Sequence, residues 1–163
     1  MINRGFLSSW PNALKSLVAL FLLVLSIGFY TGIGFVRHTT YARPQGIQDQ
    51  YLGNENDTGA NIMRFKKSEH EMFNLLHTHF LSLSVIFFIL GILTYGSKLP
   101  VVLQNFLMWE PLVSVVLTFG GLYFLWLGMH YMVYVVMISG FLMTISYSIS
   151  ILAIVLSLFK KNL

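Results

Sequence analysis

The stretch FNLLHTHFLSLSVIFFILGILTY, residues 73–95, decides the fold of this chain. It contains no Asp, Glu, Lys or Arg, and it is long enough to cross a membrane, which takes roughly 20 apolar residues at about 1.5 Å of rise per residue. The run ends at Gly96-Ser97-Lys98, a turn followed by a charge. We therefore predict a transmembrane helix over residues 73–95.

Three further apolar runs predict three more spans, at about 17–36, 105–127 and 131–159. The first run is too long for a secretory signal peptide and no small-residue cleavage site follows it, so we expect it to be retained. Hydrophobic residues make up 56% of the 163 residues and charged residues 10%, whereas a soluble domain carries about a quarter charged residues. The chain is predicted to be all-α, with residues 1–163 forming a single transmembrane domain.

The basic residues predict the direction of the spans. Uncompensated basic residues lie before the first span, between the second and third, and after the fourth (Arg4, Lys15, Lys98, Lys160 and Lys161). The positive-inside rule makes these three segments cytoplasmic. Residues 37–68 then form one external loop of about 30 residues, and short links make the later spans antiparallel neighbours. We expect an integral membrane four-helix up-down bundle with both termini cytoplasmic.

The composition excludes several classes of protein. The chain has no cysteine, which excludes disulfides, thiolate metal sites, iron–sulfur clusters and covalently attached c-type haem. The net charge of +4 is small and resides at helix ends, so no nucleic-acid-binding surface is expected. The sequence shows no nucleophile–base arrangement, phosphate loop or nucleotide fingerprint, so we do not expect an enzyme.

Two local patterns bear on how the helices begin and pack. Ser68-x-x-Glu71 is a capping box, which predicts that the second span begins near Glu69, outside the hydrocarbon. Small residues at close-packing spacing support helix contacts in the first and last spans (Gly28, Gly32, Gly140, Thr144 and Ser148). The alternative is that Gly and Ser are simply common in membrane helices.

All five histidines are predicted to lie toward the external face (His38, His70, His77, His79 and His130). His77 and His79 would lie about 12–15 Å along the second span, at the outer edge of the hydrocarbon. Because they are two residues apart, they point to nearly opposite faces. The stripe through His77 holds most of the polar and small residues of this helix (Asn74, His77, Leu81, Ser84, Phe88, Gly91 and Tyr95). We therefore expect His77 to face the bundle interior and His79 to face a neighbouring helix or a partner subunit.

Histidine clustering suggests a cofactor. Imidazoles are common ligands of haem iron and transition metals, so a pocket lined by His77, His130 and either His38 or His79 could hold b-type haem through two neutral imidazoles. A metal ion with imidazole and water ligands is a second interpretation. A third is that these histidines are interfacial anchors or hydrogen-bond partners. His70 lies in the polar zone, where solvation explains it.

Glu110 is the one carboxylate inside an apolar run. Ionisable groups in membranes are costly and usually functional. If the third span begins at Val101, Glu110 lies in mid-membrane and could relay protons. If Pro111 is the first-turn proline, Glu110 caps the helix near the cytoplasmic interface, with Trp109 as an interfacial anchor. The second interpretation accounts for all three residues, and we favour it.

The order of these features resembles a little-characterised group of small four-span bacterial inner-membrane proteins with a His-Thr-His helix start. The resemblance covers GIGFVRHTT at 32–40, Gly46-Ile47, YLGNE at 51–55, Lys67-Ser68, LHTHFLSL at 76–83 and ISGFLMT at 138–144. It implies a multi-pass protein of the bacterial inner membrane. It carries no settled activity, and a b-type-cytochrome-like or respiratory role rests on the histidine arrangement alone.

Three functions follow as expectations. The first is a b-type haem-binding or redox-associated subunit of a respiratory-type membrane complex, with other membrane subunits or a periplasmic redox protein as partners. The second is a cofactor-free structural or assembly subunit of a larger membrane complex. The third is a transporter or proton pathway through Glu110, which the lack of an evident inverted repeat disfavours.

Overall fold

The computed structural model describes residues 6–57, 59 and 62–159, and every regular element among them is a helix. In chain order these are η1 (Phe6–Ser9), α1 (Asn12–Thr40), α2 (Pro44–Leu52), α3 (Glu69–Tyr95), α4 (Val101–Trp126) and α5 (Met132–Phe159). The prediction of an all-α protein is confirmed.

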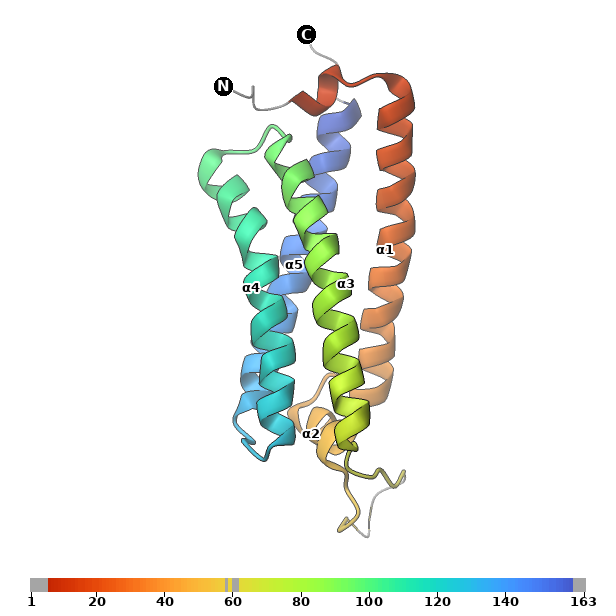
Figure 1. Ribbon diagram of the computed structural model, residues 1–163, viewed down its shortest axis with the longest axis vertical. Helices are drawn as coiled ribbons and strands as arrows, with labels where there is room; N and C mark the ends of the chain where they lie inside the picture. The colour runs from red at the N-terminus through yellow and green to blue at the C-terminus, as the bar shows by residue number, and fades with distance from the viewer. Residues whose placement is uncertain (1–5, 58, 60–61, 160–163) are drawn as a thin grey trace.

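Helices α1, α3, α4 and α5 are each long and apolar enough to cross a membrane, which confirms four spans. They run side by side with alternating direction (Figure 1). The α3–α4 turn, η1 and the last turn of α5 lie at one end, called here the terminal end. Helix α2, the described residues 53–57 and 62–68 and the α4–α5 turn lie at the other, called here the loop end. Which end faces the cytoplasm stays a prediction from the basic residues.

Helix α2 is a feature that the sequence analysis missed. Residues Pro44–Leu52 were expected to belong to an irregular loop, but Pro44 occupies the first helical turn, where its missing N–H costs nothing. The chain leaves α1 through Tyr41 and Ala42, whose φ values of 54° and 51° are left-handed. A Cβ at Gly46 would lie 2.0 Å from the carbonyl oxygen of Thr40, so only glycine permits this sharp return.

The core of the bundle is formed by α3, α4 and α5. Of the most apolar window of each span, 39% is buried in α4 and in α5 but only 6% in α1. Small side chains let α4 and α5 approach closely: a Cβ at Gly121 would lie 3.0 Å from Val136. At the next turn the hydroxyls of Thr118 and Ser139 are 2.7 Å apart. The predicted pairing of the last three spans is confirmed.

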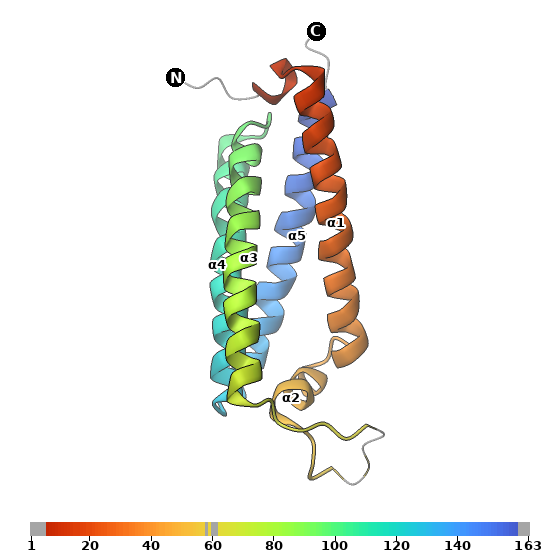
Figure 2. The same ribbon diagram turned by 45° about the vertical axis from the view of Figure 1, so that its right-hand side comes forward.

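Helix α1 is attached to the bundle at few points. Figure 2 shows α5 between α1 and the α3–α4 pair. The ring of Phe29 stacks on Tyr147 with 3.8 Å between centroids, and the Tyr147 hydroxyl is 3.1 Å from the hydroxyl of Ser26. The expectation that Gly28 and Gly32 pack against another helix of this chain is wrong, because both are exposed with no contact in place of their missing side chains. Neighbouring aromatic rings hold α1 instead.

The turn between α3 and α4 depends on one buried amide. Gln104 is fully buried, and its Nε2 donates to the carbonyl oxygens of Thr94, Tyr95 and Ser97 at 3.1, 2.9 and 3.3 Å. The last carbonyls of a helix have no partner within the helix and must find one elsewhere. Gln104 supplies such a donor from the first turn of α4, and Ser97 adds its N–H and hydroxyl at the Thr94 carbonyl.

We expect Gln104→Ala to lower the free energy of unfolding by about 2 kcal/mol, because the carbonyls at the end of α3 lose their buried donor. Unfolding of the detergent-solubilised protein in increasing denaturing detergent, followed by circular dichroism, measures the change. The neighbouring Asn105 is exposed, so Asn105→Ala is the matched control. Equal losses in the two variants would contradict this role of Gln104.

Candidate functional site

The histidines do not converge on one pocket. His38 lies in the last turn of α1, His77 and His79 near the start of α3, and His130 between α4 and α5. All belong to the loop half of the bundle, but three of the four are exposed and only His79 is half-buried. The described part of the chain holds no group of three or more His, Cys, Asp or Glu side chains that could bind a metal. A haem or metal site within one chain therefore gains no support and stays a prediction.

His79 packs between α3 and α4. Its ring stacks on Phe119 with 4.7 Å between centroids, and its Nδ1 is 2.8 Å from the carbonyl oxygen of Leu75. Because a carbonyl only accepts, Nδ1 is the donor in this contact. The expectation that His79 faces a neighbouring helix is confirmed.

His77 faces outward, so the expectation that it faces the bundle interior is wrong. The predicted stripe is exposed along most of its length. Only its last two members are covered: Gly91 is buried and Tyr95 is half-buried, near the C-terminus of α3. The buried face of α3 is instead almost entirely apolar (Met72, Leu76, Phe87, Leu90 and Leu93). In lipid both faces of a helix can be apolar, so polarity alone does not identify the buried one.

The exposed part of this stripe is called here the His77 stripe, and it consists of Asn74, His77, Leu81, Ser84 and Phe88. Its three polar side chains have no hydrogen-bond partner among the described residues. Ser82, on the adjacent face, differs because its hydroxyl donates to the carbonyl oxygen of Thr78 at 2.7 Å. The His77 stripe thus presents unsatisfied polar groups on a membrane-spanning helix.

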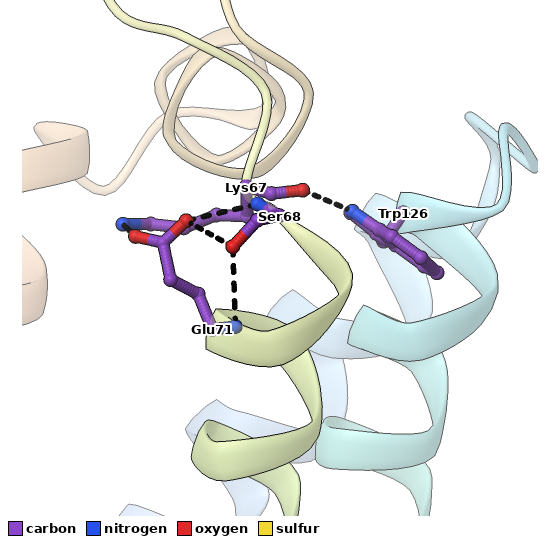
Figure 3. A network of polar contacts seen from close by, with 4 residues as sticks. All are labelled: Lys67, Ser68, Glu71 and Trp126. Carbon is purple, nitrogen blue, oxygen red and sulfur yellow. Dashed lines mark hydrogen bonds and ion pairs between the residues drawn. The ribbon is translucent and has the colours of Figure 1, made fainter.

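A polar network fixes the start of α3 against the end of α4 (Figure 3). The predicted capping box is confirmed: the Ser68 Oγ accepts from the Glu71 N–H at 3.3 Å, and Glu71 Oε2 accepts from the Ser68 N–H at 2.8 Å. Lys67 pairs with the other Glu71 oxygen at 2.8 Å. From α4, the indole N–H of Trp126 donates to the Lys67 carbonyl at 2.7 Å. The sequence analysis found the capping box but not Trp126, which is distant in the chain.

Electrostatics at this network favour the charged carboxylate. The ammonium of Lys67, and then the backbone and side chain of Ser68, donate hydrogen bonds that lower the pKa of Glu71 from 4.5 to about 2. On the α4 side, the Lys66 ammonium lies 5.1 Å from the centre of the Trp126 ring. One lysine ammonium, of Lys67, therefore lies at the start of α3, and another, of Lys66, lies at the end of α4.

Glu110 does not cap a helix, and that favoured interpretation is wrong. Helix α4 begins at Val101 and continues through Pro111, which lies inside it. By the usual rise, Glu110 is about 14 Å along α4, so it lies within the span. Ser114 donates a hydrogen bond to Glu110 Oε1, and Oε2 is buried without a partner. As expected, Glu110 is remote from the histidines.

Comparison with known proteins supports the architecture. Residues 41–163, which include α2 to α5, match the model of a family described as a transmembrane helical domain. No curated protein and no solved structure matches the chain. The family match thus agrees with the four helices in describing a small multi-pass membrane protein.

Protonation of Glu71 provides a test of the loop-end network. Because the folded pKa is lowered, its stabilisation of the helix start is complete above pH 4.5 and is lost as the pH falls toward about 2. We expect the Ser68 amide proton to shift upfield over that window in NMR spectra. Glu71→Gln removes the titration, Lys67→Met moves its midpoint upward, and Glu69→Gln is the control without effect. A midpoint at 4.5 in the parent protein would contradict the network.

Proposed function

The chain belongs to the Aq_1264_TM family of transmembrane helical domains, and from this premise we propose that it is an integral subunit of a larger membrane complex. Its contact with a partner helix is the His77 stripe of α3. In this role the chain needs no cofactor. We place the complex in the bacterial inner membrane with the loop end outside, in agreement with the positive-inside prediction.

The observation that carries this proposal is that, among the residues that the structure describes, the exposed side chains of Asn74, His77 and Ser84 have no hydrogen-bond partner, from the outer edge of the hydrocarbon to the inside of the span. Polar groups left unpaired in hydrocarbon are costly, and those in membrane helices usually face other helices. Such groups are a recognised means of holding helices together. A partner helix that donates to and accepts from these side chains would remove the cost.

The other exposed helix faces contrast with the His77 stripe. The outward side chains in the middle of α5 are all apolar (Ile138, Phe141, Leu142, Ile145, Ile149 and Leu152). Those in the middle of α4 are apolar as well (Val113, Val116 and Leu117). These faces suit lipid. The polarity of α3 is therefore a property of one helix face rather than of the whole bundle.

Haem binding is a second candidate, carried by the free imidazole of His77. Bis-imidazole ligation would take His77 as one axial ligand. The second would come from the partner, because His79 packs on Phe119 and no other histidine shares the stripe within the hydrocarbon. This arrangement keeps the subunit proposal and adds an electron-transfer role to it.

Site-specific photocross-linking tests the subunit proposal. A benzophenone amino acid replacing Leu81, in the stripe, should give a discrete cross-linked protein band in cells, and one replacing Phe141, on the α5 lipid face, should not. His77→Ala should reduce the Leu81 cross-link at least several-fold, whereas His130→Ala, an exposed imidazole outside the stripe, should not. Identical patterns from positions 81 and 141 would overturn the proposal.

An absorption spectrum separates the two candidates. If His77 ligates haem, the complex purified from cells supplied with haem shows a Soret band that disappears in His77→Ala and persists in His130→Ala. A colourless complex that still contains the cross-linked partner excludes haem and leaves the subunit proposal standing.

A further inference from the structure

Glu110 is a carboxyl group without a counter-ion in the membrane. No other Asp, Glu, Lys or Arg occurs between Lys15 and Arg37, between Glu71 and Lys98, or in α5. Glu110 is thus the one Asp, Glu, Lys or Arg side chain within the apolar stretches of the four spans. A carboxylate there cannot be neutralised by an ion pair within the bundle, and taking an unpaired charge out of water costs several kcal/mol.

The hydrogen bonds of Glu110 are too few for a carboxylate. A charged carboxylate has about four lone-pair sites to fill. The nearly buried Ser114 hydroxyl fills one on Oε1, and Oε2 receives no donor although it is out of contact with solvent. A proton on Oε2 would remove the charge and turn the unsatisfied acceptor into a donor.

The surroundings of Glu110 offer acceptors but no base. Pro111 has no N–H, so the carbonyl of Leu107, one turn earlier, lacks its helical donor. Two hydrogen bonds bracket this region, Thr118 of α4 with Ser139 of α5 and the Lys98 N–H, in the α3–α4 turn, with Ser157 of α5. By interpolation, Glu110 lies at the level of residues 146–150 of α5.

That turn of α5 contains two buried serines and one phenol. The Oγ of Ser150 is itself without a partner, and Ser146 is buried as well. The phenol of Tyr147 is bonded to Ser26 of α1. On α3, no titratable side chain occurs from Phe80 to Thr94. Glu110 therefore contacts the Ser114 hydroxyl and lies at the same level of the bundle as these α5 hydroxyl groups.

We propose that Glu110 is a proton-binding site, an intramembrane carboxylic acid that carries its proton at neutral pH. Ser114 is its positioning residue: the hydroxyl stabilises the carboxylate that forms when the proton leaves, and so sets the pH of exchange. The reaction is COOH to COO⁻ and H⁺, with no other reactant. This function goes beyond the structural role proposed above and does not depend on it.

A hydrophobic carbodiimide reports the proton directly. The acid adds across one N=C bond: its oxygen bonds to the central carbon and its proton moves to nitrogen, after which the acyl group migrates to nitrogen with no leaving group. Half-exposed Glu110 lies between the exposed Phe106 and Val113, so a membrane-dissolved reagent reaches it from lipid. A carboxylate that has lost its proton does not react.

The experiment treats the full-length protein in membranes with dicyclohexylcarbodiimide between about pH 6 and 10 and maps the adduct by mass spectrometry. We expect one adduct, on Glu110, at neutral pH, declining in alkaline solution, and none in Glu110→Gln. A water-soluble carbodiimide should label exposed loop acids such as Glu55 and not Glu110.

Ser114 variants test the positioning role. Ser114→Ala should move the decline in labelling upward by about one pH unit, because the carboxylate loses its donor, whereas Ser114→Thr retains a hydroxyl and should keep the parent profile. His77→Ala should label normally, which separates this proposal from the subunit proposal. Circular dichroism and size-exclusion chromatography establish that each variant is folded.

No adduct on folded parent protein at neutral pH, or equal labelling by the water-soluble reagent, would overturn the proton site. Identical profiles for Ser114→Ala and the parent would overturn the role of Ser114.

Discussion

Lipid cannot donate or accept hydrogen bonds, and this constraint governs every polar group in the four spans. Most are satisfied locally: serine and threonine hydroxyls bond to carbonyls of their own helix, and Gln104 serves the carbonyls that end α3. The exceptions are informative because they are few. Two of them carry the proposals made above: the His77 stripe on the outside of α3 and the buried Oε2 of Glu110 in α4; the other buried groups without a partner are Thr94 Oγ1, Gln104 Oε1 and Ser150 Oγ.

The His77 stripe and Glu110 would be satisfied in different ways. An unsatisfied group on an exposed face can be satisfied by another protein, and so the His77 stripe points outward to a partner. The unpartnered Oε2 of Glu110 belongs to a carboxylate and can be satisfied by a proton, and so Glu110 points to protonation. One physical rule thus leads from two positions to two separate functions.

The number of spans could be predicted because each is a long apolar run with few charged residues, although the third contains Glu110 and begins at Val101, before its predicted start. The start of α3 could be predicted because a capping box is local in sequence. The facing of α3 could not, because Leu76 and Leu81 are equally apolar, yet one is buried and the other exposed. The place of Glu110 was misjudged because Pro111 is compatible with both the first turn and the interior of a membrane helix, where neighbouring helices tolerate it. The packing of the helices determines both the facing of α3 and the place of Glu110, and composition does not predict packing.

The weak attachment of α1 has a consequence for how the protein is made. Its side-chain hydrogen bonds to the bundle join Ser26 to Tyr147 and Tyr30 to Ser148, pairs that are 121 and 118 residues apart. During synthesis α1 enters the bilayer first, yet the ring on which it stacks emerges only with the last helix. Before α5 is made, the only ring contact that α1 has with another of the described spans is that of Phe29 with Phe87 of α3, so the closing of the bundle is a late event in biogenesis. A membrane insertase or the partner subunit would meet α1 while the ring of Phe29 still lacks Tyr147.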